Sequence, residues 1–297
     1  MSRMSRMIRK DPIAAALLLV LVVMLLAALL APWISPWDPA AQSIDDRLLG
    51  PSVRHWLGTD ALGRDLLSRM LHGARLSLTV GLATAFFSLV LGTFTGAMAG
   101  FHRGWIDRTL TAIVDFLSIF PSLLLAILFS LLLGRGVFGI LLSIGLVAWV
   151  QHARLVRAQV MQAASRPYVE AARALGVSRH RILWRHVLPN LWGPILVSVS
   201  AQVPSNIMAE SFLSFLGLGL QPPHASWGSL AAEGLRALRS HPRLLALPSA
   251  ALFAVLLASQ YLGDWLRDRW SSRGAAEAIA VTHSPRSPRA TRVPVLR

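Results

Sequence analysis

The chain has 297 residues, of which 54% are hydrophobic and only 14% are charged, whereas an ordinary soluble domain is about 25% charged. This composition excludes a soluble globular protein and indicates an integral membrane protein. The absence of cysteine excludes disulfides and thiol chemistry, and a single lysine, Lys10, excludes a Gly-x-x-x-x-Gly-Lys-Ser/Thr phosphate loop.

The first predicted membrane span covers residues 13–31, which carry no charge and follow a basic N-terminus at 1–12. A span needs about 20 such residues. The alternative is a cleaved signal peptide, whose apolar core is usually about 7–15 residues. Because this run is longer and Pro32 makes a poor cleavage context, we predict an uncleaved anchor.

Five further apolar segments are predicted to cross the membrane, at residues 76–101, 109–134, 136–151, 190–210 and 244–263. In the first of them, glycines spaced from Gly81 to Gly100 allow neighbouring helices to approach. In the span at 190–210, Pro194 and Pro204 are expected to bend the helix.

Four longer segments connect or follow these spans. Residues 32–75 are predicted to form an external loop with an amphipathic interfacial helix, and 152–189 a basic cytosolic loop. Residues 211–243 are apolar but broken by prolines, which favours a re-entrant or interfacial loop. Residues 264–297 form the C-terminal tail, with a short interfacial helix at its start and disorder expected after 273.

The charge distribution predicts the orientation. The segments 1–12, 101–108, 151–190 and 264–297 hold 20 of the 29 Lys and Arg residues. Positive residues concentrate on the cytosolic side of membrane proteins. Both termini and the loop at 152–189 are therefore predicted to be cytosolic, and the net charge of +15 reflects topology.

The segment 168–190 has two possible interpretations as a local pattern. Apolar residues recur at helical spacing up to Gly176, which is typical of a helix end, and Ser178 can cap a second helix that closes at Pro189. Such a helix–turn–helix fits a DNA-binding unit or a docking helix on a membrane protein. Because membrane spans flank it and no third helix is available, we favour docking.

Four separated motifs occur in order along residues 12–270. They are His55-Trp-Leu-Gly-Thr-Asp-Ala-Leu-Gly-Arg-Asp65 with Ser68-Arg69 and Gly73-Ala-Arg75; Glu170-Ala171-Ala172 with Gly176, Ile182 and Leu188-Pro189; Glu210 with Leu213-Ser-Phe-Leu-Gly-Leu-Gly219, Gln221-Pro-Pro223 and Ser226-Trp-Gly228; and Gly263-Asp264 with Leu266-Arg-Asp268. Together they resemble the permease subunits of binding-protein-dependent ABC importers, specifically the C-type (second) permease of the dipeptide/oligopeptide/nickel family. Two departures are Ser271-Ser272-Arg273 in place of the family's Asp-Pro-Arg, and Pro167 in place of an acidic residue.

This resemblance implies an all-α integral membrane protein with six transmembrane helices and the type I ABC importer permease fold, similar to the methionine permease, over about residues 74–268. It implies a multi-pass protein of the bacterial inner (plasma) membrane that imports di- or oligopeptides, or a nickel- or glutathione-type solute. Its partners would be a homologous second permease, two cytosolic ATP-binding subunits and an external solute-binding protein, besides membrane lipids. No cofactor, nucleic acid or enzymatic activity of the chain itself is implied.

The same resemblance assigns roles to individual residues. ATPase coupling would involve Tyr168, Glu170, Ala171, Ala172, Leu175, Gly176, Ile182, Leu188 and Pro189. Glu170 would bond to the ATPase or within the loop, the two alanines would permit close contact, and Gly176 would make the turn. The external-loop motifs contribute Gly58, Asp60, Gly63, Arg64, Asp65, Gly217, Gly219, Trp227 and Gly228.

Four polar residues could line a pathway: Asp115, Gln202, Asn206 and Glu210. An acid at the bilayer centre costs about 2.5–3.5 kcal/mol on insertion scales, so for Asp115 a polar partner in the bundle is the favoured alternative. No metal ligands are predicted.

Two other functional classes remain as alternatives. A secondary transporter would show inverted repeats with broken helices in matched positions, and neither is clear in this sequence. A membrane enzyme is disfavoured, because the chain has no His-Glu-x-x-His or Gly-x-Ser-x-Gly motif and no histidine pair spaced i, i+4.

Overall fold

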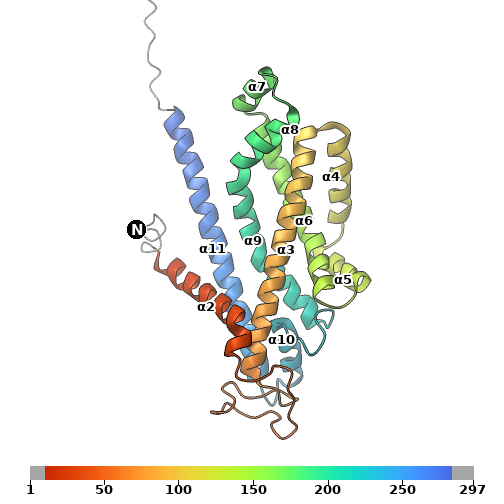
Figure 1. Ribbon diagram of the computed structural model, residues 1–297, viewed down its shortest axis with the longest axis vertical. Coiled ribbons are helices and arrows are strands. Elements are labelled where there is room, and N and C mark those ends of the chain that lie inside the picture. The colour runs from red at the N-terminus through yellow and green to blue at the C-terminus, as the bar shows by residue number, and fades with distance from the viewer. Residues whose placement is uncertain (1–10, 283–297) are drawn as a thin grey trace, which may run out of the picture.

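The computed structural model describes residues 11–282, with side chains for residues 11–268, and this part of the chain is almost entirely helical (Figure 1). The elements are α2 (Pro12–Ile34), α3 (Leu66–His102), α4 (Gly104–Ser118), α5 (Ser122–Leu133), α6 (Val137–Ala164), α7 (Pro167–Ala174), α8 (Arg179–Ile182), the π-helical turn η1 (Leu183–Val187), α9 (Leu188–Phe215), α10 (Trp227–Arg236) and α11 (Arg243–Thr282). We call the two ends of the bundle the α7 end and the α10 end.

Helix α3 is the centre of the bundle and runs between α6 and α9 (Figure 1). Its glycines lie against the neighbouring helices, as their spacing predicted. A Cβ atom on Gly96 would come within 2.9 Å of the Arg157 nitrogen and of the Val156 Cβ in α6, and one on Gly81 would collide with Ile207 of α9. The small residues of α3 therefore set the interhelical distances at the middle of the molecule.

The predicted third span, 109–134, is not one straight helix. Helices α4 and α5 meet at a bend of 95°. The bend lies at Pro121, which has no N–H to bond back into α4 and which disfavours a helical conformation at Phe120. Helix α5 then restarts with the Leu125 N–H bonded to the Pro121 carbonyl at 3.0 Å. The predicted span at 109–134 is therefore sharply bent, and the sequence did not predict this bend.

Several predicted boundaries also differ because helices continue through the connections. The expected interfacial helix before 76 is the first part of α3, which begins where the Asp65 side chain accepts the Ser68 N–H. Helix α6 passes residue 151 and reaches Ala164, and the loop at 211–243 contains α10, which Ser226 starts with a capping box.

The C-terminal tail differs as well. The short interfacial helix predicted after 263 is part of α11, which continues to Thr282 through an alanine-rich segment with high helix propensity. Disorder was predicted after 273, so for 274–282 the structure contradicts the prediction. Residues 283–297, which share that prediction, lie outside the described residues.

Four helices, α2, α3, α6 and α11, are long and apolar enough to cross a membrane, and the bent pair α4–α5 passes the same test as one unit. The span predicted at 190–210 lies in α9, which is 28 residues long but carries polar groups such as Gln202, Asn206 and Glu210. Five of the six predicted spans therefore correspond to a helix or a bent pair that could cross a membrane, and the span at 190–210 stays a prediction.

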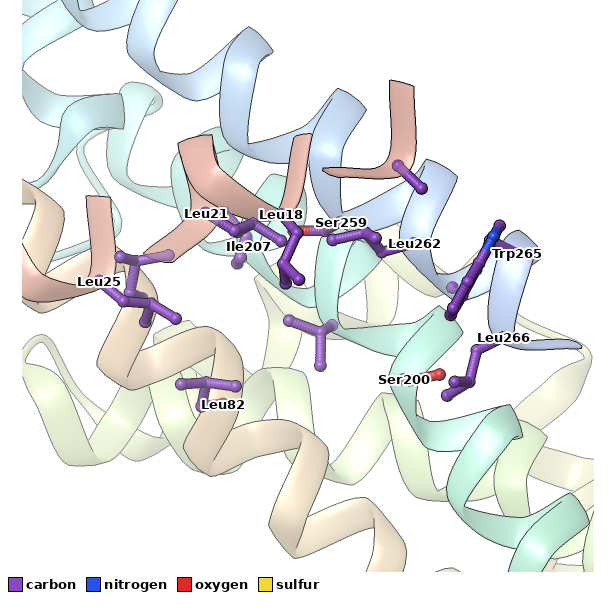
Figure 2. A pocket seen from close by; sticks show the side chains of 14 residues that line it. Leu18, Leu21, Leu25, Leu82, Ser200, Ile207, Ser259, Leu262, Trp265 and Leu266 are labelled. Atoms are coloured by element: carbon purple, nitrogen blue, oxygen red, sulfur yellow. The ribbon is translucent and has the colours of Figure 1, made fainter. Parts of the chain in front are cut away.

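Helix α2 is the most loosely attached of these helices. It packs against α3 and α11, and most of its leucines are exposed. An apolar cavity of about 390 Å³ lies between α2 and residues of α3, α9 and α11. Figure 2 shows Leu18 and Leu21 of α2 near Ile207 of α9, with Leu262 of α11 beside them. A helix that is apolar on all sides requires lipid or another chain around it.

We predict that Gly96→Ala destabilises the protein. In an exposed helix this change would be favourable by about 1 kcal/mol, because alanine has the higher helix propensity. Here the added Cβ forces α6 away from α3, and overpacking of this kind costs about 1–3 kcal/mol. The detergent-purified variant should therefore melt at a lower temperature than the wild type, as followed by tryptophan fluorescence.

Gly263→Ala is the matched control, because the nearest heavy atom to its Cβ would be the Ala201 Cα at 3.5 Å, an ordinary contact. This variant should melt at or above the wild-type temperature. If both variants melted at the wild-type temperature, close packing of α3 on α6 would not determine the stability of the bundle.

Candidate functional site

A compact helical protrusion stands at the α7 end (Figure 1). Helix α7 ends in two backbone bonds, from Gly176 N–H to the Arg173 carbonyl at 3.0 Å and from Val177 N–H to the Ala172 carbonyl at 3.1 Å. Gly176 has φ of +78°, the left-handed conformation that favours glycine at a helix end. Helix α8 follows after Ser178, whose side chain makes no capping bond, so the helix–turn–helix forms as predicted without that bond.

The inner face of the protrusion is anchored in the bundle core. Val169 of α7, Ile182 of α8, and Leu183 and Val187 of η1 are completely buried. They form one cluster with side chains of α3 and α6, including Phe101. Each fully buried side chain of this kind contributes about 1.5–3 kcal/mol. The protrusion is therefore packed onto the bundle as part of the same body.

The outer face of the protrusion combines arginines with apolar side chains. Leu175 is 83% exposed, and Tyr168 and Trp184 are each 42% exposed. Glu170 and Ala171 are also exposed, and Glu170 makes no ion pair with any residue in the described part of the chain. This is a surface that can receive a partner on both apolar and charged groups.

The predicted coupling residues therefore divide into two groups. Ala172, Ile182 and Leu188 face the bundle, so they hold the protrusion in place. The expectation that Ala172 permits close contact with a partner is wrong, because α7 turns this residue inward. Trp184 was not among the predicted residues, because the apolar run Ile182-Leu183-Trp184 does not show which of its members faces outward.

Pro189 does not close the second helix, contrary to the prediction. The chain continues from α8 through η1 into α9, with the Leu188 N–H bonded to the Leu183 carbonyl in the wider π-helical pattern. A wider turn accommodates the missing proline donor. The Asn190 side chain donates to the His186 carbonyl at 2.7 Å. The protrusion is thus continuous with α9.

The four proposed pathway residues lie in different surroundings. Asp115 of α4 pairs with Arg154 of α6 at 2.6 Å, and about half of each side chain is exposed. Gln202 accepts from Ser88 of α3 at 2.8 Å. Asn206 is only 4% exposed. The structure does not bring these residues together at one open surface.

Glu210 cannot line a pathway in this conformation, because it is fully buried. Its carboxylate accepts from the Ser214 hydroxyl at 2.8 Å and from Ser211 at 3.3 Å, and the hydroxyls of Ser77 of α3 and Ser226 before α10 lie close enough to interact with it. The carboxylate thus connects three elements at the α10 end, and its predicted pathway role is corrected to a structural one.

A missed polar residue, His152, connects three helices. It is buried in α6, with its Nε2 3.2 Å from the Thr93 hydroxyl of α3 and its Nδ1 3.4 Å from the Ser198 hydroxyl of α9. Sequence gave no sign of this, because an isolated histidine at the end of an apolar segment has no characteristic partner spacing.

A buried ionic cluster joins the loop before α3 to α10. The Asp60 carboxylate accepts from Arg64 at 2.7 Å and from Arg69 at 2.6 Å, and the Glu233 carboxylate accepts from the same two arginines at 2.9 and 2.5 Å. Burial by itself would raise the pKa of Asp60, but the charges of Arg69 and Arg64 and backbone N–H bonds hold the pKa below its usual range. Glu233, more than 160 residues from the arginines, was not predicted.

The remaining motif residues shape the loops around this cluster. Asp65 accepts from the His55 ring at 2.9 Å while capping α3. Gly58, Gly63 and Gly217 have positive φ. A side chain on Gly219 or Gly228 would run into the C-terminal part of α9, and the Trp227 indole donates to the Met70 carbonyl of α3 at 3.2 Å. These residues let two distant loops pack on the ends of α3 and α9.

Comparisons with known proteins identify the family. The model of the binding-protein-dependent transport system inner membrane component matches residues 92–273, more than half of the chain, and the N-terminal transmembrane domain of oligopeptide transport permease C matches residues 1–51. The chain belongs to this family of binding-protein-dependent permeases. The family assignment made from the four motifs is confirmed.

Three permeases are similar in sequence to this chain over most of their length. The oligopeptide transport system permease protein OppC of Bacillus subtilis (strain 168) is 38% identical over 260 residues, 88% of this chain and 85% of the relative. The dipeptide permease DppC of the same organism is 40% identical (89% and 82% covered), and the glutathione permease GsiD of Pectobacterium atrosepticum is 38% identical (89% and 87% covered).

The prediction of an all-α fold similar to the methionine permease is also confirmed. Two crystal forms of the inward-facing MetNI methionine ABC transporter match with TM-scores of 0.50 and 0.52 at 18% and 16% identity, covering 67% of this permease and 94% and 95% of the matched chains. The permease is a multi-pass inner membrane protein with this fold. The roles predicted for individual residues remain predictions.

We predict that Asp60→Asn destabilises the permease, because it leaves two buried arginines with one carboxylate. Breaking a buried ion pair costs on the order of 3 kcal/mol. The melting temperature at pH 7, measured by tryptophan fluorescence in detergent, should therefore fall well below that of the wild type.

The difference in melting temperature between the wild type and Asp60→Asn should also depend on pH. The pKa of Asp60 is lowered by folding, so its stabilisation is present above the unfolded value of about 3.8 and is lost as pH falls through the lower folded value. The difference in melting temperature between the wild type and Asp60→Asn should narrow below pH 3.8. A constant difference down to pH 2 would contradict this assignment.

Proposed function

We propose that the protein is one of two permease subunits of an ATP-driven importer for di- or oligopeptides or related small solutes, and that the protrusion at α7 and α8 couples it to a cytosolic ATPase. The observation that carries this proposal is an exposed, partly apolar protrusion that is packed into α3 and α6 and continuous with α9. A surface built in this way can transmit force from a partner to the membrane helices.

The solute class rests on the relatives. Permeases named for oligopeptides, dipeptides and glutathione resemble this chain to a similar degree. All three solutes are short chains of amino acids with free charged groups. We therefore favour a small peptide or a glutathione-type solute over nickel, which the family resemblance also left open.

The proposed orientation places the α7 end in the cytosol. Arginines are concentrated in residues 151–190, and the positive-inside tendency assigns such a segment to the cytosolic side. Both termini then lie in the cytosol, and the loop before α3 and helix α10 lie outside, where a solute-binding protein delivers the solute. ATP would be bound by partner subunits, because the chain has only one lysine and no phosphate loop.

The proposed mechanism is rigid-body motion. Closure of the ATPase subunits moves the protrusion, and because Val169, Ile182 and Val187 are buried against the bundle, α6 and α9 move with it. Glu170 is available for a charge-assisted bond to the ATPase. The second permease would cover exposed apolar faces such as that of α4 and α5, where Phe116 and Leu124 are about 60% exposed.

A secondary transporter, the alternative from the sequence, would have broken helices in matched positions of inverted repeats, whereas the described residues contain one bent pair, α4–α5. Purification of the permease from native membranes in mild detergent separates the two. A bound ATPase and ATP-dependent uptake support the importer, whereas uptake driven by an ion gradient without ATP would reject it.

Leu175→Ser should weaken the ATPase contact. Burial of a leucine contributes about 1.5–3 kcal/mol, so this change should reduce affinity about 10- to 100-fold if Leu175 enters the interface. The ATPase subunits should be lost during purification, and uptake should fall at matched membrane levels. Leu216→Ser is the control, because Leu216 is exposed at the opposite end of α9. Equal ATPase retention in both variants would contradict the docking assignment.

Gly176→Val should impair coupling without preventing insertion. The residue has φ of +78° and open space around it, so the cost is backbone strain of about 1–2 kcal/mol and a displaced turn. Gly176→Asn should retain most uptake, because asparagine tolerates this conformation. Uptake by the valine variant equal to that of the asparagine variant would show that the turn geometry is unimportant.

A further inference from the structure

A cavity of about 500 Å³ opens at the α10 end of the permease. It lies between α3, the start of α6, and the loops around residues 38–40 and 223–225. Apolar side chains form part of its wall, among them Leu76, Val80, Val137 and Ala225, and the polar side chains that line it are Asp38, His72, Arg75, Thr79 and His224. Its volume is in the range of small-molecule sites.

The two charged groups of the cavity are not neutralised by the protein. Neither Asp38 nor Arg75 makes an ion pair with any residue in the described chain, although both line the same space. The neighbouring cluster is different, since Arg64 and Arg69 each pair with both Asp60 and Glu233. The cavity therefore offers one positive and one negative group to a ligand.

Hydrogen bonds within α3, within the loop at 37–40 and between the two hold the polar wall in place. The His72 Nδ1 donates to the Ser68 carbonyl at 3.0 Å, which leaves Nε2 as an acceptor in the neutral ring. The Trp37 N–H donates to the Ser68 hydroxyl at 3.2 Å, and the Asp38 carboxylate accepts the Ala40 N–H at 2.8 Å. The loop that carries Asp38 is thus fixed beside the helix that carries Arg75, which reduces the entropy cost of binding.

We propose that this cavity binds a short zwitterionic peptide on the outer side of the membrane. The Arg75 guanidinium pairs with the C-terminal carboxylate, the Asp38 carboxylate pairs with the N-terminal ammonium, and the apolar wall receives a side chain. This inference rests on the proposed function for the solute class and the orientation.

The test uses the complete transporter, with both permeases and the ATPase subunits, in lipid nanodiscs without the binding protein. Binding of alanyl-alanine, its C-terminal amide and its N-acetyl derivative is measured by saturation-transfer NMR. Because hydrogen bonds to a charged group are strong, Arg75→Gln should weaken alanyl-alanine binding at least about tenfold. The amide, which lacks the carboxylate, should bind the wild type and Arg75→Gln equally weakly.

Asp38→Asn should give the complementary result, with equal weak binding of the N-acetyl peptide to wild type and variant. Arg239→Gln is the control, because it removes the same charge at an exposed arginine that follows α10 and does not line the cavity. It should bind alanyl-alanine as the wild type does.

Two results would overturn the inference: no binding of alanyl-alanine to the wild type at tens of millimolar, or equal affinities for Arg75→Gln and Arg239→Gln. Uptake of labelled peptides by cells with the complete wild-type system is measured in parallel. If uptake occurs while either result is obtained, the cavity assignment fails and the proposed function stands. If wild-type cells show no peptide uptake, the proposed function itself fails.

Discussion

The packing of one short apolar face on the bundle core is the interaction on which the arrangement depends. Val169, Ile182, Leu183 and Val187 are withdrawn completely from solvent against α3 and α6. Without this burial, two short helices of eight and four residues would not be stable, since isolated helices of that length are marginal in water. With it, an exposed surface becomes a fixed part of a membrane bundle.

Different interactions stabilise the α10 end. Loops that are distant in sequence pack on the ends of α3 and α9 through buried ions, serine hydroxyls around Glu210, and glycines that admit a neighbouring backbone. Such groups are costly to bury unless every partner is present, so they favour a single arrangement of the loops. In the proposed importer, the solute arrives at this end and the ATPase binds at the α7 end. Helices α3, α6 and α9 connect the two ends.

The sequence predicted the features that depend on local chemistry. Gly176 ends α7 because only glycine readily adopts its positive φ, and the glycines of α3 meet α6 as their spacing suggested. Features that depend on tertiary context were missed. A proline in a span predicts a bend but not its size, so the 95° bend at Pro121 was not predicted. The π-helical turn η1 lets the helix continue past Pro189. Glu233 contacts its two arginines only after folding, because they are distant in sequence. Glu210 was misassigned because an acid in a span suggests function, whereas the surrounding serines that make it structural come from three elements.

The central claim is that the protrusion and α9 move as one body. Because the chain contains no cysteine, spin labels can be introduced at two cysteine substitutions without other changes, at Ser178 before α8 and at Leu196, which is 51% exposed on α9. The distance distribution between the labels is measured by pulsed electron paramagnetic resonance in the complete transporter, without nucleotide and with ATP trapped. The account predicts the same narrow distribution in both states. A shift or broadening of several ångströms with ATP would show that the protrusion moves independently of α9, and would contradict it.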